Sequence, residues 1–510
     1  MRRSLRLAIV TAPLLAAACG GGSYSRNAES VGSLPASPSS MAYVADGDVA
    51  ASTEQFTDYG VNGLTDASKD HLSTFAIDVD TASYSITRRY ILQQGSPPPP
   101  SAVRVEEFIN SFGYDYVRPT ATPFAVYSSG APSPFAKGHS IIRVALQGKS
   151  IAPQERKPVH LVYLVDTSGS MSAADKIELA KKSLRLLTDT LHQGDTVALC
   201  TYAGSVSLVL PPTGIDDKAK ILKGIDNLMA GGSTAMASGI ELAYSLASKT
   251  HVPGDVSRVI VLSDGDANVG NTSHEDILKT IVKYKEQGIT LSTVGFGSGN
   301  YKDTMMEQLA DKGDGNYSYI DSETEARRVF GESVDGLLQV IARDVKVQVD
   351  FDPKVVKEYR LIGYENRDVA DKDFKNDRVD GGEVGAGHSV TALYDVVLQA
   401  NAAGATGSPL TVHVRAKPPL GGDKATESEF PMDPKSMVKS FDEAPASFRF
   451  VTAVVGFGEI LRKSPYAHDF GFAQIQTIAE GAIEGKADRI AFLDLVRRAG
   501  GGAPQTPLAR

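Results

Sequence analysis

The sequence predicts an α/β protein in which a doubly wound, mainly parallel sheet is inserted in a β-sandwich, with a small N-terminal α/β unit and a C-terminal helical segment. Two observations predict this fold class. First, residues 158–342 alternate helix-like segments with apolar runs such as "HLVYLV" and "RVIVL", which are typical of parallel strands buried on both faces. Second, strand-like runs stand before and after this region. Because the two ends of an inserted domain lie close together, a sandwich can accommodate such an insertion.

Inside residues 158–342, five runs are the expected strands: "VHLVYLV", "DTVALCTY", "RVIVLS", "ITLSTVGF" and "NYSYI". Between the first two, apolar residues recur at helical spacing, which predicts a helix that packs on the sheet. These residues are Ile177, Ala180, Leu184, Leu187 and Leu191. We therefore expect the alternation of strands and helices that a doubly wound domain requires.

The segments outside this domain follow in order along the chain. Residues 20–72 are rich in Gly, Ser, Ala and Asp, which predicts a flexible linker. Residues 73–118 predict the small N-terminal unit, in which Asp80 caps a helix. We expect sandwich strands in 119–157 and 343–432, with the turn "GYENR" organising the sandwich. A helical segment is expected in 433–498 and a disordered tail in 499–510.

The N-terminus predicts export and lipidation. Residues 1–19 combine the basic residues Arg2, Arg3 and Arg6 with an apolar run that is too short to span a bilayer. They end in "LLAAAC", which resembles a bacterial lipobox and predicts a lipoprotein signal peptide with cleavage before Cys19 and acylation of that cysteine. A plain signal peptide cleaved after an alanine is the alternative. We expect the protein in the cell envelope, lipid-anchored to a bacterial membrane, at the outer membrane on its periplasmic or surface face.

The composition limits the classes of partner. The chain has 510 residues, 42% of them hydrophobic and 22% charged, which is typical of a globular protein with more than one core. Its net charge of −9 argues against nucleic-acid binding, which needs basic patches that displace counterions. The sequence contains no P-loop and no dinucleotide-binding glycine turn, so we expect no nucleotide partner either.

Hydroxyl and carboxylate residues gather where predicted strands end. "VYLVDTSGSMS" places Asp166, Ser168 and Ser170 directly after the first strand, and "VLSDGD" places Asp264 after another. Thr234 lies in the glycine-rich turn "GGSTA" before a predicted helix. Because the carboxyl ends of parallel strands meet at one edge of an open sheet, these side chains are expected at the same edge. Hard oxygen ligands suit Mg²⁺, or Mn²⁺ or Ca²⁺, and do not suit zinc.

These three motifs, in this order, resemble the metal-ion-dependent adhesion site (MIDAS) of von Willebrand factor type A (VWA) domains. The resemblance implies metal ligation by the hydroxyls of Ser168, Ser170 and Thr234, and a role largely through water for Asp166 and Asp264. Asp266 lies close to Asp264, but the family pattern points to Asp264. The flanking motifs "STFAIDVDTASYS", "PPPPSAVRVEEFIN", "GYENR" and "GEVGAGHSVTALYDV" are similar to bacterial envelope VWA proteins of the YfbK type.

The ligand set predicts a binding protein. Hydroxyls are neutral, so a Mg²⁺ that they hold keeps much of its positive charge, and its octahedral geometry leaves a position for water. An Asp or Glu carboxylate of a protein partner can replace that water. We therefore expect a membrane-tethered envelope protein whose MIDAS binds a partner carboxylate.

Two alternatives remain open. The first is an assembly or maturation factor for another complex. The second is a metal-dependent hydrolase, because a bound metal can activate water. The surroundings of Ser168 and Ser170 do not match the G-x-S-x-G motif of serine hydrolases, so we expect no enzyme.

Overall fold

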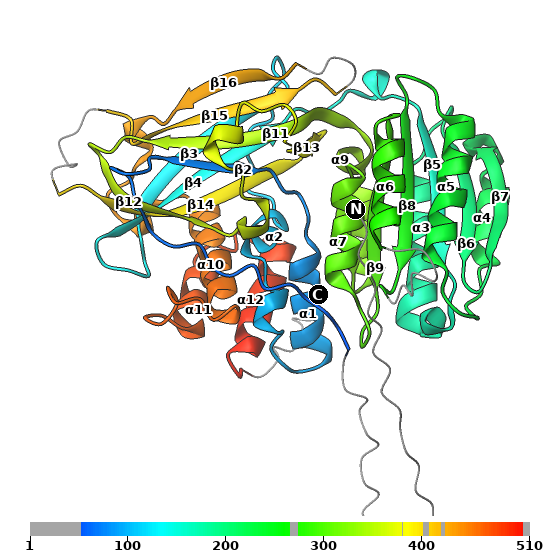
Figure 1. The fold of residues 1–510 in the computed structure, drawn as a ribbon. Coiled ribbons are helices and arrows are strands. Elements are labelled where there is room, and N and C mark those ends of the chain that lie inside the picture. Colours follow the sequence, from blue (N-terminus) through cyan, green and yellow to red (C-terminus); the bar gives the residue numbers. More distant parts are fainter. Residues whose placement is uncertain (1–52, 266–273, 380, 401–406, 420–423, 503–510) are drawn as a thin grey trace, which may run out of the picture. The chain divides into compact units, whose positions relative to one another are not determined.

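The computed structural model describes residues 53–265, 274–379, 381–400, 407–419 and 424–502 (Figure 1). The predicted signal peptide, Cys19 and most of the predicted linker lie outside the described residues, as does most of the predicted tail. None of the helices in the described ranges has the length and apolar character needed to cross a membrane.

The predicted doubly wound domain contains a six-stranded sheet in the order β10-β9-β8-β5-β6-β7. All neighbouring strands are parallel except β7, which runs antiparallel to β6 at the edge of the sheet. The strands are β5 (Val159–Asp166), β6 (Thr196–Tyr202), β7 (Val206–Gly214), β8 (Val256–Ser263), β9 (Ile289–Phe296) and β10 (Tyr317–Ile320). β7 was not predicted from the sequence, because the strand is largely exposed and contains two prolines, as edge strands can.

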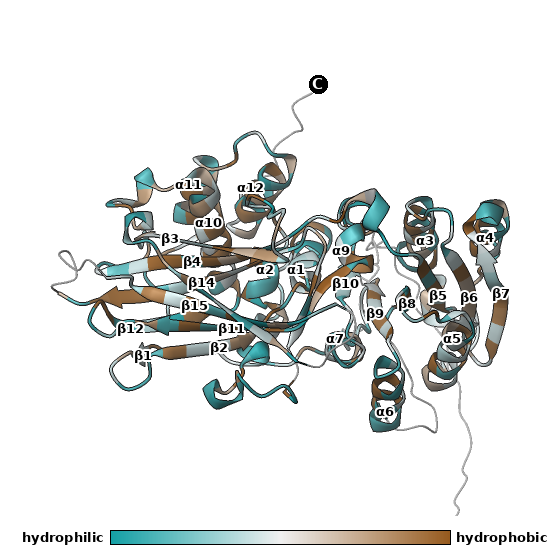
Figure 2. Ribbon diagram, turned by 90° about the horizontal axis from the view of Figure 1, so that it is seen from above, coloured by the Kyte–Doolittle hydropathy of each residue, from teal (hydrophilic) through white to brown (hydrophobic). Residues whose placement is uncertain are grey.

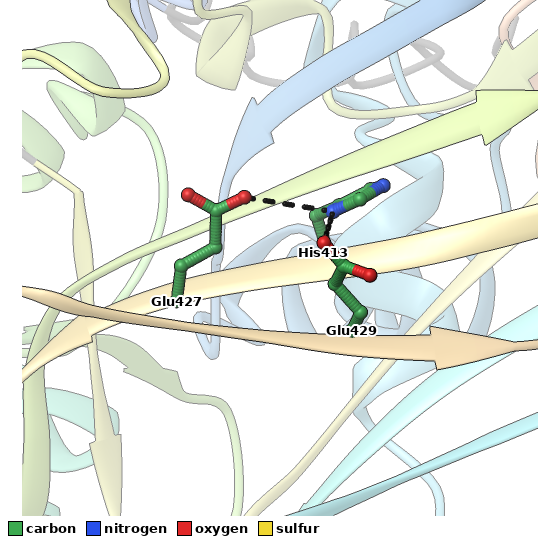
Figure 3. Close-up of side chains that lie close together, drawn as sticks. All are labelled: His413, Glu427 and Glu429. Atoms are coloured by element: carbon green, nitrogen blue, oxygen red, sulfur yellow. Dashed lines mark ion pairs between the residues drawn. The ribbon is translucent and has the colours of Figure 1, made fainter.

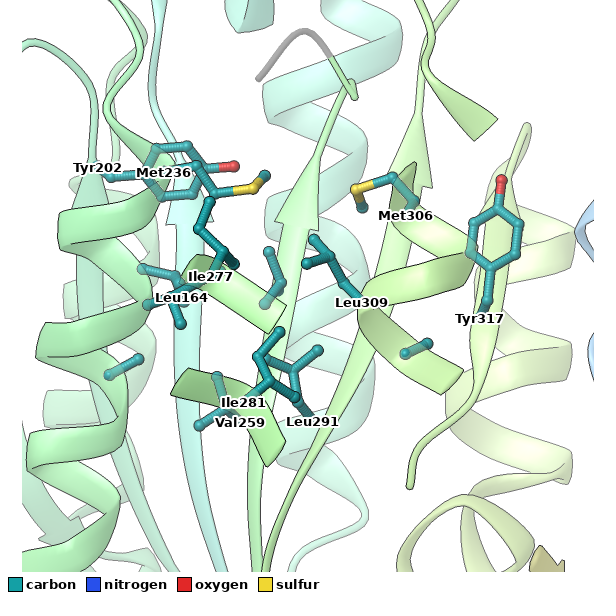
Figure 4. Packing of buried hydrophobic residues seen from close by; sticks show 14 of the residues in the cluster. Leu164, Tyr202, Met236, Val259, Ile277, Ile281, Leu291, Met306, Leu309 and Tyr317 are labelled. Carbon is teal, nitrogen blue, oxygen red and sulfur yellow. The ribbon is translucent and has the colours of Figure 1, made fainter. Parts of the chain in front are cut away.

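Helices cover both faces of this sheet. In Figure 2, α3 and α4 lie on one side of the strands and α5 and α6 on the other, with hydrophilic colours on their outer faces. The helices are α3 (Leu179–Asp189), α4 (Lys218–Asp226), α5 (Met236–Thr250), α6 (His274–Lys285), α7 (Asp303–Lys312), α8 (Glu323–Arg327) and α9 (Val334–Leu338). Leu184 and Leu187 of α3 are buried on one face, as the helical spacing predicts. Figure 4 shows the opposite face, where Leu164 and Val259 pack with Met236, Ile277 and Leu309 from three helices.

Two antiparallel sheets form the predicted sandwich. The first has the order β1-β12-β14-β4-β3, and the second has the order β13-β11-β15-β16, with β2 pairing beside β13 on β11. The strands are β1 (Thr65–Asp66), β2 (Leu72–Ala76), β3 (Phe124–Pro132), β4 (His139–Gly148), β11 (Val340–Phe351), β12 (Val356–Ile362), β13 (Gly382–Gly385), β14 (Ser389–Leu398), β15 (Leu410–Lys417) and β16 (Thr426–Pro431). The chain leaves the sandwich after β4 and returns in β11, so the predicted insertion is confirmed.

The predicted small N-terminal unit, residues 73–118, packs into the rest of the protein. Its strand β2 pairs with β11 of the sandwich, and its helices share one core with the C-terminal helical segment. The helices are α1 (Ala82–Gln93), α2 (Val105–Asn110), α10 (Ala446–Leu461), α11 (Phe472–Glu480) and α12 (Ala487–Ala499). Phe112 of the N-terminal segment makes edge contacts with Phe450 and Phe492, at ring-centroid distances of 5.1 and 5.6 Å. The segment therefore depends on residues more than 300 positions away.

The predicted linker 20–72 includes residues at its C-terminal end that the structure shows to be part of the fold. Within its described part, β1 pairs with β12. Glu54 forms a buried ion pair with Arg89, with Oε1 2.7 Å from Nη1. Burial raises the pKa of the Glu54 carboxyl, but the Arg89 guanidinium outweighs this effect, so the pKa lies below its ordinary value. Specific pairing of this kind orders a segment whose composition is typical of a linker.

The turn "GYENR" joins three parts of the protein. Arg367 lies at the end of a short helical turn (Glu365–Arg367) after β12. Its guanidinium contacts Asp78 (Nε–Oδ2 3.3 Å), Asp80 (Nη2–Oδ2 3.2 Å) and Asp311 of α7. The prediction that Asp80 caps α1 is wrong, because its carboxylate instead accepts the backbone N–H of Tyr317 at 2.7 Å. The turn thus connects the sandwich to the N-terminal segment and to the inserted domain.

Candidate metal centre

Asp166 lies at the carboxyl end of β5, the strand between β8 and β6 in the middle of the sheet. Its side chain is fully buried. Oδ1 accepts the backbone N–H of Ser168 at 2.9 Å, and Oδ2 accepts the hydroxyl of Ser263 at 2.9 Å. Burial raises the pKa of the Asp166 carboxyl, the nearby Asp264 raises it further, and the hydrogen bonds oppose the rise. The carboxylate is therefore fixed in position and would gain from a cation close by.

The two predicted serines follow on the same loop. Ser168 is buried and Ser170 is half-buried, and their hydroxyl oxygens lie 2.9 Å apart. A short 3-10 turn (Gly169–Ser172) and a π-helical turn (Ala174–Glu178) then lead into α3. Two hydroxyl oxygens at this separation can both contact one cation, since cis ligands of a Mg²⁺ at about 2.1 Å lie about 3 Å apart.

The turn that carries Thr234 is hydrogen-bonded directly to this loop. The N–H of Gly169 donates to the carbonyl of Gly232 at 2.9 Å, and the N–H of Gly231 donates to the carbonyl of Thr167 at 2.7 Å. Gly232 has a φ of +99°, a conformation that favours glycine. Thr234 stands two residues further on, half-buried and just before α5. The backbone contacts thus bring the second motif to the first.

Asp264 follows β8, next to β5, and is fully buried. The preceding residue, Ser263, donates its hydroxyl to Asp166, which joins the third motif to the first. Asp264 Oδ2 accepts a hydrogen bond from Lys176 Nζ at 3.0 Å. Residues 266–273, including Asp266, lie outside the described residues.

Lys176 is not among the site residues predicted from the sequence. The residue lies on the π-helical turn before α3 and is buried. One signal could have found it, since Lys176 stands four positions before Ala180 and so falls on the apolar face of the predicted helix.

The loops that carry the five predicted residues therefore meet at one edge of the sheet. They offer two carboxylates and three hydroxyls, all oxygen donors, which fits Mg²⁺, Mn²⁺ or Ca²⁺. Asp166 and Ser168 are already held by hydrogen bonds, as the ligands of a preorganised metal site are. Such a cation would supply a positive charge to which an acidic group can bind.

A second group of potential ligands lies in the sandwich (Figure 3). His413 of β15 faces Glu427 and Glu429 of β16, with its Nδ1 3.6 and 3.7 Å from their Oε1 atoms. Lys375 pairs with the other oxygen of Glu427 at 3.4 Å, and the side chain of Glu429 is 67% exposed. Because one carboxylate has a cationic neighbour and the other faces water, we assign this group to cross-strand pairing that holds β16 on the sheet.

Comparison with known proteins agrees with this fold. A family model for the von Willebrand factor type A domain matches residues 160–332, and a model described as von Willebrand factor matches residues 50–143. A model for the C-terminal part of the uncharacterized protein YfbK matches residues 336–501. The inserted α/β domain is a VWA domain, a class whose members commonly mediate protein interactions and often bind a divalent metal such as Mg²⁺.

The chain also matches whole proteins. It is 36% identical over 475 residues to the uncharacterized protein YfbK of Escherichia coli (strain K12), which covers 88% of this chain and 81% of that protein. The chain belongs to the YfbK-type family of bacterial VWA proteins. It is 27% identical over 227 residues to inter-alpha-trypsin inhibitor heavy chain H3 of Mesocricetus auratus, covering 42% of this chain and 24% of that protein. The solved structure of von Willebrand factor type A from Catenulispora acidiphila is 16% identical, covers 76% of this chain and 91% of its own, and gives a TM-score of 0.42.

Proposed function

We propose that this protein is a binding protein of the bacterial cell envelope, which holds a protein partner through a divalent cation and is tethered to a membrane by acylated Cys19. The cation is held by Asp166, Ser168, Ser170, Thr234 and Asp264. The observation that carries the proposal is the meeting of three loops at one sheet edge, joined by the hydrogen bonds of Gly169, Gly231 and Ser263. The hydroxyl ligands leave the cation with charge for a carboxylate of the partner.

Exposed apolar side chains beside the metal centre support a protein partner. Met229 is 81% exposed and stands two residues before Gly231, whose N–H binds the Asp166 loop. Val206 and Leu208 of the edge strand β7 are 37% and 47% exposed. Their strand begins directly after the turn in which Gly204 lies close to Ser233. Apolar groups near a charged centre are typical of the contact area around an anchoring interaction.

The position of His160 gives no support to nucleophilic catalysis at Ser168. His160, the nearest histidine before Ser168 in the sequence, lies at the start of β5, at the opposite edge of the sheet from Asp166. Its ring nitrogens contact Thr196 at 2.9 Å and Asp255 at 3.2 Å. VWA proteins are mostly non-enzymatic interaction or adhesion proteins.

Partner capture from the cell envelope tests the proposal. The immobilised protein is incubated with envelope extract in Mg²⁺ or in EDTA, and bound proteins are identified by mass spectrometry. We expect a partner that the protein retains in Mg²⁺ and releases in EDTA. The double variant Ser168→Ala/Ser170→Ala is expected not to retain this partner. Ser172→Ala is the matched control, since Ser172 is an exposed serine on the same turn. Retention that survives EDTA and the double substitution would refute the proposal.

The anchor has a separate test. Cys19→Ser removes the thiol that would carry the acyl chains, so we expect the variant to leave the membrane fraction and to lose metabolic labelling by palmitate. Cys200→Ser is the control, because Cys200 is buried inside β6, where burial raises the pKa of its thiol to about 12. Such a thiol is unreactive. Palmitate labelling that Cys19→Ser leaves unchanged would contradict the tether.

A further inference from the structure

A lysine ammonium lies inside the proposed metal centre. Lys176 Nζ donates hydrogen bonds to Asp264 Oδ2 at 3.0 Å and to Asn300 Oδ1 at 3.3 Å. The side chains of Lys176 and Asp264 are 8% and 0% exposed. Lysine is rarely buried unless its charge is paired, so the ion pair with Asp264 accounts for the burial of this ammonium.

Packing fixes the reach of this lysine. A Cβ atom on Gly297 would overlap the methylene carbons of the Lys176 side chain, so the stem lies directly against that glycine. Gly297 follows β9, the neighbour of β8, and its carbonyl accepts hydrogen bonds from Arg89 and Tyr319. Gly297 is thereby held in place, and the side chain that lies on it points its ammonium at Asp264. The charge is a fixed part of the centre.

From this geometry we infer that Lys176 is an internal cation of the metal centre, which weakens binding of the divalent cation and strengthens the hold of the bound cation on an acidic group. The inference rests on the proposed function. Its basis is the charge balance: Asp166, Asp264 and Lys176 carry −1, −1 and +1, which sum to −1. A divalent cation brings the centre to +1, and one carboxylate from a partner neutralises it. Without the lysine, the loaded centre would be neutral and would attract an acidic group less.

A purely structural ion pair predicts the opposite result. If Lys176 only positions Asp264, its loss leaves a ligand misplaced, and metal affinity falls. If the lysine charge competes with the metal, its loss leaves Asp264 with a full negative charge for the metal, and metal affinity rises. The direction of the change therefore separates the two roles.

The experiment uses Mn²⁺ alone as the probe, with the full chain. Mn²⁺ affinity is measured by electron paramagnetic resonance for the wild type, for Lys176→Met and for Lys176→Gln. The glutamine variant keeps an N–H donor and serves as the test if the methionine variant does not fold. We expect at least tenfold tighter Mn²⁺ binding in both variants. Lys181→Met is the matched control, because it removes the same charge from the same helical segment, where Lys181 pairs with Glu178. Its Mn²⁺ affinity should stay at the wild-type value.

A second readout follows the acidic group. Acetate that displaces water from the bound Mn²⁺ lowers the water proton relaxation rate, and we expect the Lys176 variants to need several-fold more acetate than the wild type. Folded variants that bind Mn²⁺ no more tightly than the wild type overturn the inference and leave the proposed function standing. A wild type that binds no Mn²⁺ above the Asp166→Asn background refutes the proposed function itself.

Discussion

Asp166→Asn is expected to weaken Mg²⁺ and Mn²⁺ binding by about 100-fold or more. The substitution removes one of the two carboxylates that face the proposed cation and keeps the shape of the side chain. The amide oxygen can still accept the N–H of Ser168, and the Ser263 hydroxyl can turn to accept from the amide nitrogen. The variant should therefore fold. Because Asp264 raises the pKa of Asp166, the neutral amide also relieves repulsion in the metal-free protein.

Thermal unfolding with and without Mg²⁺ gives the clearest measurement. A ligand that binds only the folded state stabilises it by about 2.7 kcal/mol at 100 times its dissociation constant. We expect this metal-dependent rise in melting temperature for the wild type and not for Asp166→Asn. The metal-free variant should melt at or above the wild-type temperature. Asp255→Asn is the control, since Asp255 lies at the opposite edge of the same sheet. Equal stabilisation of Asp166→Asn and the wild type by Mg²⁺ would place the cation elsewhere.

The sequence predicts the VWA domain well because its strands are buried on both faces. β5 and β8 are continuous apolar runs for that reason, and the helix after β5 shows the spacing of a helix that packs on one side. β7 escapes prediction because an edge strand needs no such run, and its apolar residues Val206 and Leu208 are partly exposed. The pattern of hydrophobicity thus reports burial, and in this sheet it identifies most clearly the strands that are buried on both faces.

The N-terminal segment could not be placed from sequence, because its partners are distant along the chain. Asn62, in the predicted linker, donates its side-chain amide to the carbonyls of Leu361 and Gly363, and Phe108 contacts Phe457 of α10 within the core shared with the C-terminal helices. Local composition carries no record of such contacts. It therefore predicts a linker and a small N-terminal unit, and it does not show that these segments complete the sandwich and the helical core.

In the proposed site, too, one part could be predicted from the sequence more readily than another. The meeting of the three motifs could be predicted because each motif follows a strand or opens a helix, so topology alone brings the motifs to one sheet edge. Lys176 is harder to predict, because its place on the apolar face of the predicted helix is a weak signal and a lysine near the start of a helix usually faces water. Its burial depends on Gly297, which is 121 positions away by residue number and has a φ of +74°.

Arg367→Met is expected to lower the free energy of unfolding by about 3–5 kcal/mol at neutral pH. Arg367 is the cation shared by Asp78 and Asp80 of the N-terminal segment and by Asp311 of the VWA domain. Burial raises the pKa of Asp80 well above its ordinary value, Asp78 raises it further, and Arg367 opposes the rise. Without the guanidinium, the two buried carboxylates would be left with uncompensated charge, a large penalty in a medium of low dielectric constant.

The pH dependence of this loss separates charge from packing. Ionising a carboxyl whose pKa is raised by folding destabilises the folded protein, and this penalty is fully present above the folded pKa. Below the unfolded pKa of about 3.9 the carboxyl is protonated in both states, so the penalty is absent. The destabilisation by Arg367→Met should therefore be largest at about pH 7 and shrink toward pH 4. Since the chain has no tryptophan, urea unfolding is followed by far-ultraviolet circular dichroism. Arg378→Met, at an exposed arginine eleven residues further along the chain, should cost less than about 0.5 kcal/mol at both pH values. A loss for Arg367→Met that is equal at both pH values would mean that the side chain acts through its packing, and the three-way charge contact would not be what joins the VWA domain to the rest of the protein.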